Sequence, residues 1–172
     1  SGGDAHGIAR GLLGRSSPFR PRFATLCRFR SPRASDEILA TFFPAPHSYT
    51  GEDVVELSAH GSPVVLGALV QGAMSCGARM AEPGEFTLRA FLNQRLDLPQ
   101  AEAVADLIDA VTPRQARAAF DHLNGTLTRA IAAIHEPLFD LIARLEASVD
   151  FPDEGYHFAA PDAVVEEVDA LV

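Results

Sequence analysis

The chain has 172 residues, of which 47% are apolar and 22% charged, and this composition fits a globular protein with at least one good core. No apolar run approaches the roughly 20 residues of a membrane span, and the first residues lack the apolar core of a signal peptide, so we expect a cytoplasmic protein without a membrane partner. The net charge of -9 argues against a general nucleic-acid binder, although residues 1–33 are basic.

The first forty residues predict a short helix and two strands. The helix covers residues 4–14 and ends at Gly14, and the strands cover 22–30 and 37–43 on either side of a turn-rich segment. In the first strand apolar and basic side chains alternate, which predicts one core face and one basic face: Phe23, Cys27 and Phe29 against Arg22, Arg28 and Arg30. For Arg22, Arg28, Arg30 and Arg33, a solvated sheet face or a dimer contact is favoured over binding of nucleic-acid phosphates.

The next predicted strand, 53–60, carries the polar residues that matter most. Side chains alternate across a strand, so Val55, Leu57 and Ala59 point one way and Val54, Glu56, Ser58 and His60 the other. The strand therefore offers three polar groups on one surface.

Helices dominate the middle of the chain. Gly61 permits a turn, Ser62 can act as a cap and Pro63 suits a first helical position, which predicts a helix to about Cys76 that stops at Gly77. A short strand at 78–82 and helices at 85–93 and 99–109 follow. The last of these places four apolar residues on one face: Ala101, Val104, Ala105 and Ile108.

From Thr112 the pattern becomes entirely helical. Thr112 to Gln115 form a capping box, and apolar residues then recur at steps of three and four, which predicts a long helix with Gly125 and Pro137 as places for a bend or break. A loop over 150–160 and a last helix over 161–171 complete the prediction. We place the domain boundary near 112, giving domains 1–111 and 112–172 in an α+β protein.

A ligand site is predicted around Glu56, Ser58 and His60, together with the loop 48–52 and Arg95. From spacing alone, Glu56 is better explained as a solvated strand residue, Arg95 as a surface cation and His60 as a structural hydrogen-bonder. Cys27 and Cys76 have no His or Cys at metal-ligand spacing, so we expect no metal site and no disulfide. The carboxylates of residues 151–154, FPDE, fit a helix-ending loop better than acid–base chemistry.

Four motifs between Ser48 and Asp109 resemble the tRNA-modification GTPase MnmE (TrmE) family: SYTGEDVVEL, AHGSP, AEPGEFTLRAFLNQRLDL and PQAEAVADLID. The resemblance implies an N-terminal mixed α/β folate-binding and dimerisation domain, related in fold to the glycine-cleavage aminomethyltransferase, followed by long helices of an incomplete bundle. It also implies a first strand with an RISG-like segment before Ser1 and Gly2, whose Arg is a third folate contact and is absent here.

The resemblance carries two functional residues over to this chain. The Glu of the VEL segment is Glu56, and the basic residue of the NQRLDL segment is Arg95; both are implied contacts of a tetrahydrofolate derivative, 5-formyl- or 5,10-methylene-tetrahydrofolate. A carboxylate can accept both the ring N–H and the amino group of a pterin, and a guanidinium can meet the anionic glutamyl tail.

The family's GTPase chemistry is not expected within these residues. The sequence has no GxxxxGK[ST] motif and no lysine, so GTP, Mg and K belong to a domain absent from it. The implied partners are a second copy of the protein as a homodimer, the flavoprotein MnmG (GidA), and tRNA modified at carbon 5 of the wobble uridine. The alternatives are a stand-alone folate-dependent aminomethyl or methyl transferase and a non-catalytic dimerisation module.

Overall fold

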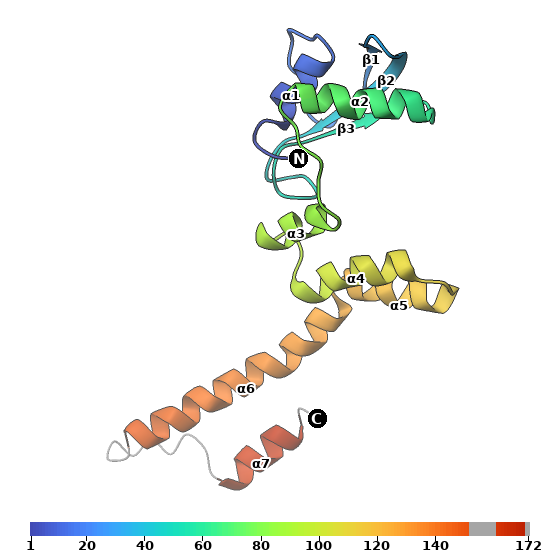
Figure 1. Ribbon diagram of the computed structural model, residues 1–172. Helices are drawn as coiled ribbons and strands as arrows, with labels where there is room; N and C mark the ends of the chain where they lie inside the picture. Colours follow the sequence, from blue (N-terminus) through green and yellow to red (C-terminus); the bar gives the residue numbers. More distant parts are fainter. Residues whose placement is uncertain (152–160, 171–172) are drawn as a thin grey trace. The chain divides into compact units, whose positions relative to one another are not determined.

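The computed structural model describes residues 1–151 and 161–170 and has the mixed α/β content that the sequence predicts (Figure 1). Its elements in chain order are α1 (Ala5–Leu12), β1 (Thr25–Arg30), β2 (Ser35–Phe43), β3 (Val54–Ser58), α2 (Pro63–Ser75), α3 (Glu85–Leu92), α4 (Leu98–Asp109), α5 (Pro113–Leu123), α6 (Thr126–Asp150) and α7 (Pro161–Asp169). The chain forms two compact units, Ser1–Ala101 and Glu102–Val172, which divide inside α4 rather than at residue 112.

A three-stranded antiparallel sheet in the order β1-β2-β3 organises the first unit. The strand predicted at 78–82 is wrong, because this segment is not part of the sheet in the described structure. Its first residue instead continues the end of α2 through a hydrogen bond from Ala78 N–H to Ala73 O of 3.0 Å. The Arg79 side chain is tied to Glu85, so local contacts replace strand pairing.

Helices α1 and α2 cover one face of the sheet and form the core with it. Phe29 and Ile38 are each 1% exposed and are among the largest fully buried side chains. The predicted inward face of β3 is confirmed, since Val55, Leu57 and Ala59 pack against this core. Burial of large apolar side chains is the main stabilising contribution in such a layer pair.

The opposite face of the sheet is open within the first unit. Leu26 and Leu39 lie opposite each other in the register and are 64% and 45% exposed. Arg28 is on the same face and pairs with Glu37 at 2.9 Å, so the face predicted to be basic also carries apolar and acidic side chains.

The prediction that Phe23 belongs to the core is wrong. This residue precedes β1, which begins only at Thr25, and its ring is 52% exposed. The guanidinium of Arg20 lies over the ring, 5.2 Å from its centroid. The alternating pattern in the sequence begins at residue 22, before the strand itself begins, so it does not predict the burial of Phe23.

The N-cap residues predicted for α2 and α5 are both found at the helix starts. Ser62 is the N-cap of α2, as predicted, but its side chain makes no capping hydrogen bond. Thr112 and Gln115 do form the predicted reciprocal capping box at the start of α5. The helix then breaks at Gly125, which has a φ of 78°, whereas Pro137 is accommodated inside α6.

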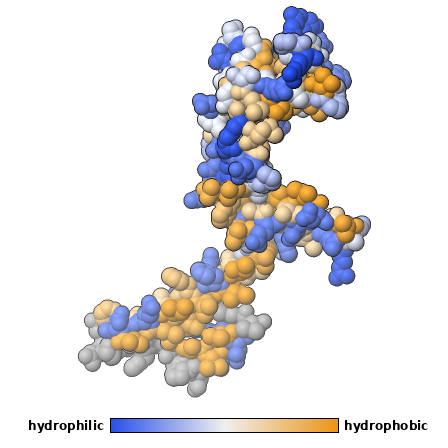
Figure 2. All heavy atoms as spheres, in the orientation of Figure 1, coloured by the Kyte–Doolittle hydropathy of each residue, from blue (hydrophilic) through white to orange (hydrophobic). Residues whose placement is uncertain are grey.

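The apolar face predicted for α4 is only partly buried. Ala101 and Val104 are half-buried, Ala105 is exposed and Ile108 is 77% exposed, whereas the buried residue of the helix is Ala103, outside the predicted face. Apolar side chains also lie exposed along α6, where Figure 2 shows them in orange; they include Ile131, Ile134 and Ile142. No helix among the described residues is long and apolar enough to cross a membrane. Of the predicted FPDE loop, residues 152–154 lie outside the described residues.

Candidate functional site

Glu56 and Arg95, which are far apart in the sequence, line one open cavity of about 360 Å³ in the first unit. The wall of this cavity is built from the open face of the sheet and from the loop between β2 and β3, and its other lining residues are Arg22, Phe43, His47, Ser48, Tyr49 and Val54. The structure therefore brings together the two residues that the sequence assigns to folate.

Among the described residues, neither of these two charged groups is paired with a charged side chain. Arg95 donates from Nε to the backbone oxygen of Ser48 at 3.2 Å, and within residues 1–151 and 161–170 its terminal nitrogens have no hydrogen-bond partner. Glu56 is exposed, and in the same part of the chain its carboxylate forms neither a hydrogen bond nor an ion pair, although its backbone is paired with β2. The cavity thus presents a free double acceptor and a free cationic donor.

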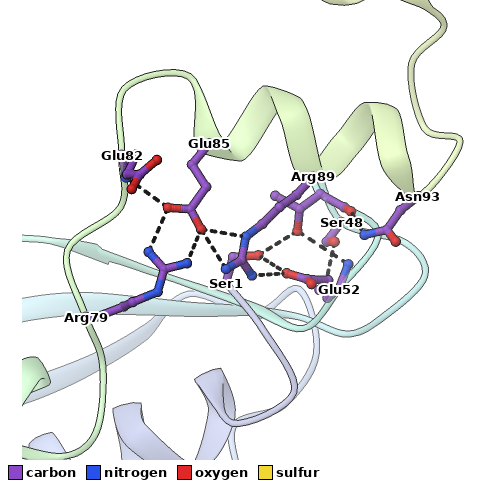
Figure 3. Close-up of polar contacts among 9 residues, drawn as sticks. Ser1, Ser48, Glu52, Arg79, Glu82, Glu85, Arg89 and Asn93 are labelled. Carbon is purple, nitrogen blue, oxygen red and sulfur yellow. Dashed lines mark hydrogen bonds and ion pairs between the residues drawn. The ribbon is translucent and has the colours of Figure 1, made fainter.

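The loop from Pro44 to Asp53 is held firmly, although it is irregular. It contains a cis peptide bond between Ala45 and Pro46, and Ser48 and Thr50 are buried at 6% and 0% exposure. The Thr50 backbone oxygen accepts a 2.7 Å hydrogen bond from Nδ2 of Asn93 (Figure 3). Because the buried polar groups of this loop have hydrogen-bond partners, the loop forms a fixed part of the cavity wall.

Helix α3 fixes the same loop through a network of charges. Arg89 pairs with Glu52 of the loop at 2.7 Å and with Glu85, one helical turn away, at 2.8 Å (Figure 3). The hydrogen bond from Arg89 lowers the pKa of Glu52, and the hydrogen bond from Arg79 is the largest cause of the strongly lowered pKa of Glu85. Both acids are therefore ionised at neutral pH, and their charges are already compensated.

Ser58 and His60 follow Glu56 along the strand but do not line the cavity. The imidazole Nδ1 of His60 lies 2.7 Å from Oδ1 of Asp36, and its backbone N–H donates to Oδ2 at 3.0 Å. The backbone bond is the largest cause of the lowered pKa of Asp36. This arrangement fits a structural hydrogen-bonder, the alternative left open for His60.

Sequence reasoning did not assign Arg22 to this site, whereas Tyr49 belongs to the predicted loop 48–52. Arg22 was placed on a basic sheet face, yet it lines the cavity. The Tyr49 hydroxyl lies 3.0 Å from Oγ1 of Thr87, which fixes its half-exposed ring at the wall.

A second cavity, also about 360 Å³, lies between α1, β3 and α3. Its walls are largely apolar and include Ile8, Leu12 and Leu57. Among its charged lining residues, Arg79 and Arg89 are both bonded to Glu85, so these three offer a ligand less than the groups at Glu56 and Arg95. No cluster that could hold a metal ion occurs among residues 1–151 and 161–170.

Comparison with known proteins places both parts of the chain in one family. Residues 1–95 match the family model described as the GTP-binding protein TrmE N-terminus, and residues 98–172 match the MnmE helical domain. The tRNA modification GTPase MnmE of Azoarcus sp. (strain BH72) is 50% identical over 160 residues, which cover 92% of this chain and 35% of that protein.

Further relatives agree with this assignment. The protein of the same name from Nitrosospira multiformis is 53% identical over 140 residues, covering 80% of this chain and 31% of the relative. That of Coxiella burnetii (strain RSA 493 / Nine Mile phase I) is 45% identical over 172 residues, covering 99% and 38%. The chain thus spans about a third of the length of these relatives, and over that span it belongs to the tRNA modification GTPase MnmE (TrmE) family.

Proposed function

We propose that this chain is the folate-binding part of a tRNA-modifying enzyme, and that the cavity between Glu56 and Arg95 holds a one-carbon derivative of tetrahydrofolate. The observation that carries the proposal is the convergence of these two residues on one cavity with their charged groups unpaired in the described chain. A cavity of about 360 Å³ that opens to solvent is within the range of small-molecule sites.

The chemistry of the lining residues fits such a ligand. The two oxygens of Glu56 can accept the ring N–H and the exocyclic amino group of the pterin, and the guanidinium of Arg95 can donate to a carboxylate of the glutamyl tail. Tyr49 and Phe43 add aromatic wall for the rings between these ends. When bound, the 5-formyl- or 5,10-methylene-tetrahydrofolate would supply the one-carbon unit of the reaction.

The wider role that we propose rests on family membership. The relatives are named tRNA modification GTPases, and we infer that the longer protein acts in the cytoplasm on carbon 5 of the wobble uridine together with MnmG (GidA). GTP, Mg and K would bind in its GTPase domain, outside these 172 residues. The relation in fold to the glycine-cleavage aminomethyltransferase belongs to the same proposal.

Homodimerisation is the second part of the proposal. The specific observation in its favour is the pair of exposed leucines on the open sheet face, Leu26 and Leu39, since an apolar pair in register is a surface that a second copy could cover. Sedimentation equilibrium of the chain and of the Leu26→Glu variant tests this part separately. We expect the variant to shift the equilibrium toward monomer, and an unchanged distribution would contradict the proposed surface.

Isothermal titration with 5-formyltetrahydrofolate tests the ligand. We expect the chain to bind, and Glu56→Gln and Arg95→Gln each to weaken binding about 10- to 100-fold, the range for losing a charged hydrogen bond. The matched control is Glu37→Gln, since Glu37 is an exposed acid of the neighbouring strand that pairs with Arg28 and does not line the cavity. Absence of binding to the unaltered chain, or equal affinity in Glu56→Gln and the control, would refute the proposal.

A further inference from the structure

Arg22 is held at the cavity by backbone contacts that are unusual for a residue outside a strand. Its N–H donates to the backbone oxygen of Phe42 at 2.7 Å, and the preceding Pro21 forms an isolated parallel bridge with the same residue. The segment before β1 is thereby pinned beside the end of β2. The side chain of Arg22 is exposed and lines the cavity together with Glu56 and Arg95.

The backbone conformation at this cavity is a second observation. Among the described residues, two that are not glycine have a positive φ, Arg22 and Gln94, each at 57°. One of these residues, Arg22, lines the cavity, and the other, Gln94, directly precedes the second lining arginine, Arg95. A left-handed backbone is unfavourable for a residue with a Cβ, and such strain persists where surrounding contacts enforce it, often at ligand-binding positions.

The two arginines also contact the loop in parallel ways. Nη2 of Arg22 donates to the backbone oxygen of His47 at 3.2 Å, and Nε of Arg95 donates to that of Ser48 at 3.2 Å. Consecutive carbonyls of the loop are therefore each fixed by one guanidinium. A guanidinium has five N–H donors, so each arginine keeps donors for a ligand after making this contact.

From these three observations we infer that Arg22 is a second anion-binding residue of the site and acts beside Arg95 on the carboxylates of the ligand's glutamyl tail. This inference rests on the proposed function and deepens it. The lining residues then comprise one acid and two permanent cations, a set that complements a ligand with one donor edge and a dianionic tail. The site should consequently distinguish tailed folates from pterins that have no tail.

The variant Arg22→Gly tests this, because glycine removes the guanidinium while it relieves the left-handed backbone. We expect Arg22→Gly to weaken binding of 5-formyltetrahydrofolate about tenfold and to leave binding of a tailless tetrahydropterin unchanged within twofold. Gln94→Gly is the matched control, since it relieves the same backbone conformation and removes no cation. It should bind both ligands as the unaltered chain does.

A second pair of variants separates charge from position. Arg22→Lys keeps a positive charge but loses the planar guanidinium. Its affinity for 5-formyltetrahydrofolate should lie between those of the unaltered chain and of Arg22→Gly. Arg20→Gln removes a nearby arginine that lies over Phe23 instead of lining the cavity, and it should leave both affinities unchanged. Far-UV circular dichroism of each variant checks that it is folded.

The outcomes distinguish this inference from the proposed function. If the unaltered chain binds the tailed folate but Arg22→Gly binds it equally well, the role of Arg22 is refuted and the folate site stands. If Arg22→Gly weakens both ligands equally, Arg22 only positions the loop, which also refutes the inference. If the unaltered chain binds neither ligand, both proposals fail.

Discussion

Replacing Gly51 by alanine should damage the candidate site from within its own loop. Gly51 has a φ of 78°, and a Cβ at this position would lie 3.0 Å from Cβ of Asn93 and 3.2 Å from Cγ of Arg95. Both neighbours belong to the segment that follows α3. The substitution therefore adds a strained backbone conformation and a close contact with the stem of a ligand-binding arginine.

The magnitude follows from these two contributions. A left-handed conformation costs alanine about 1–2 kcal/mol, which the smaller conformational entropy of the unfolded chain offsets by about 0.4–1 kcal/mol. Overpacking against neighbours that cannot move freely adds about 1–3 kcal/mol. The Cβ of Asn93 is such a neighbour, since its side-chain amide is bonded to Thr50 O in a buried loop. We expect a total destabilisation of about 2–4 kcal/mol.

Amide hydrogen exchange of β2 and β3 is the suitable measurement, because it reports the free energy of opening for the sheet that carries the loop. Gly14→Ala is the matched control: its φ is 59°, and a Cβ there would meet nothing within 4 Å. The control should lower protection by about 1 kcal/mol or less. Equal losses in the two variants would refute the close contact, and an unchanged folate affinity in Gly51→Ala would refute its effect on Arg95.

Four further variants test the core, the helical unit and the charge network. Phe29→Ala should lower the free energy of unfolding in urea by about 3–5 kcal/mol, whereas Phe23→Ala should cost under about 1 kcal/mol; similar values would contradict their different burial. Thr112→Ala should lower the stability of α5 by about 1 kcal/mol in hydrogen exchange, and no change would contradict the capping box. Arg89 lowers the pKa of Glu52, so this carboxylate stabilises the fold above pH 4.5 and loses that contribution as the pH falls through its lowered pKa. The acid-induced loss of stability should be smaller in Glu52→Gln, and identical pH profiles would show that the pair contributes nothing.

Local patterns were sufficient for the elements whose cause is local. The alternation around Glu56 predicted both the strand and its inward face, and the capping box at Thr112 predicted the start of a helix to the residue. The helix breaks at Gly125 because this residue has a positive φ, a conformation that glycine adopts readily. These predictions did not require knowledge of any distant contact.

The predictions that failed depended on neighbours that are distant in the sequence. Residues 78–82 have an extended, strand-like sequence, but a strand also needs a pairing partner, and among the described residues this segment has none. The apolar stripe of α4 was read correctly as a pattern, yet its burial depends on what packs against it, and Ile108 remains exposed. Periodicity identifies the side chains that can be buried and cannot identify those that are.

The same distinction explains how much of the candidate site was predicted. Glu56 and Arg95 were assigned from motif resemblance, and only the fold could show that they face one cavity. Arg22 was missed because its place depends on a left-handed backbone and on a hydrogen bond to Phe42, neither of which leaves a periodic signal.

The contacts of the loop show how the fold can support a site that is exposed to solvent. Free charges at a cavity need a rigid frame, since a mobile loop would have to lose conformational entropy when a ligand binds. Here Asn93 and Arg89 fix one side of the loop from α3, and Arg22 and Arg95 fix two successive carbonyls at the cavity. The two cavity arginines therefore also anchor the loop, so the proposed ligand-binding groups are part of the frame that orders it.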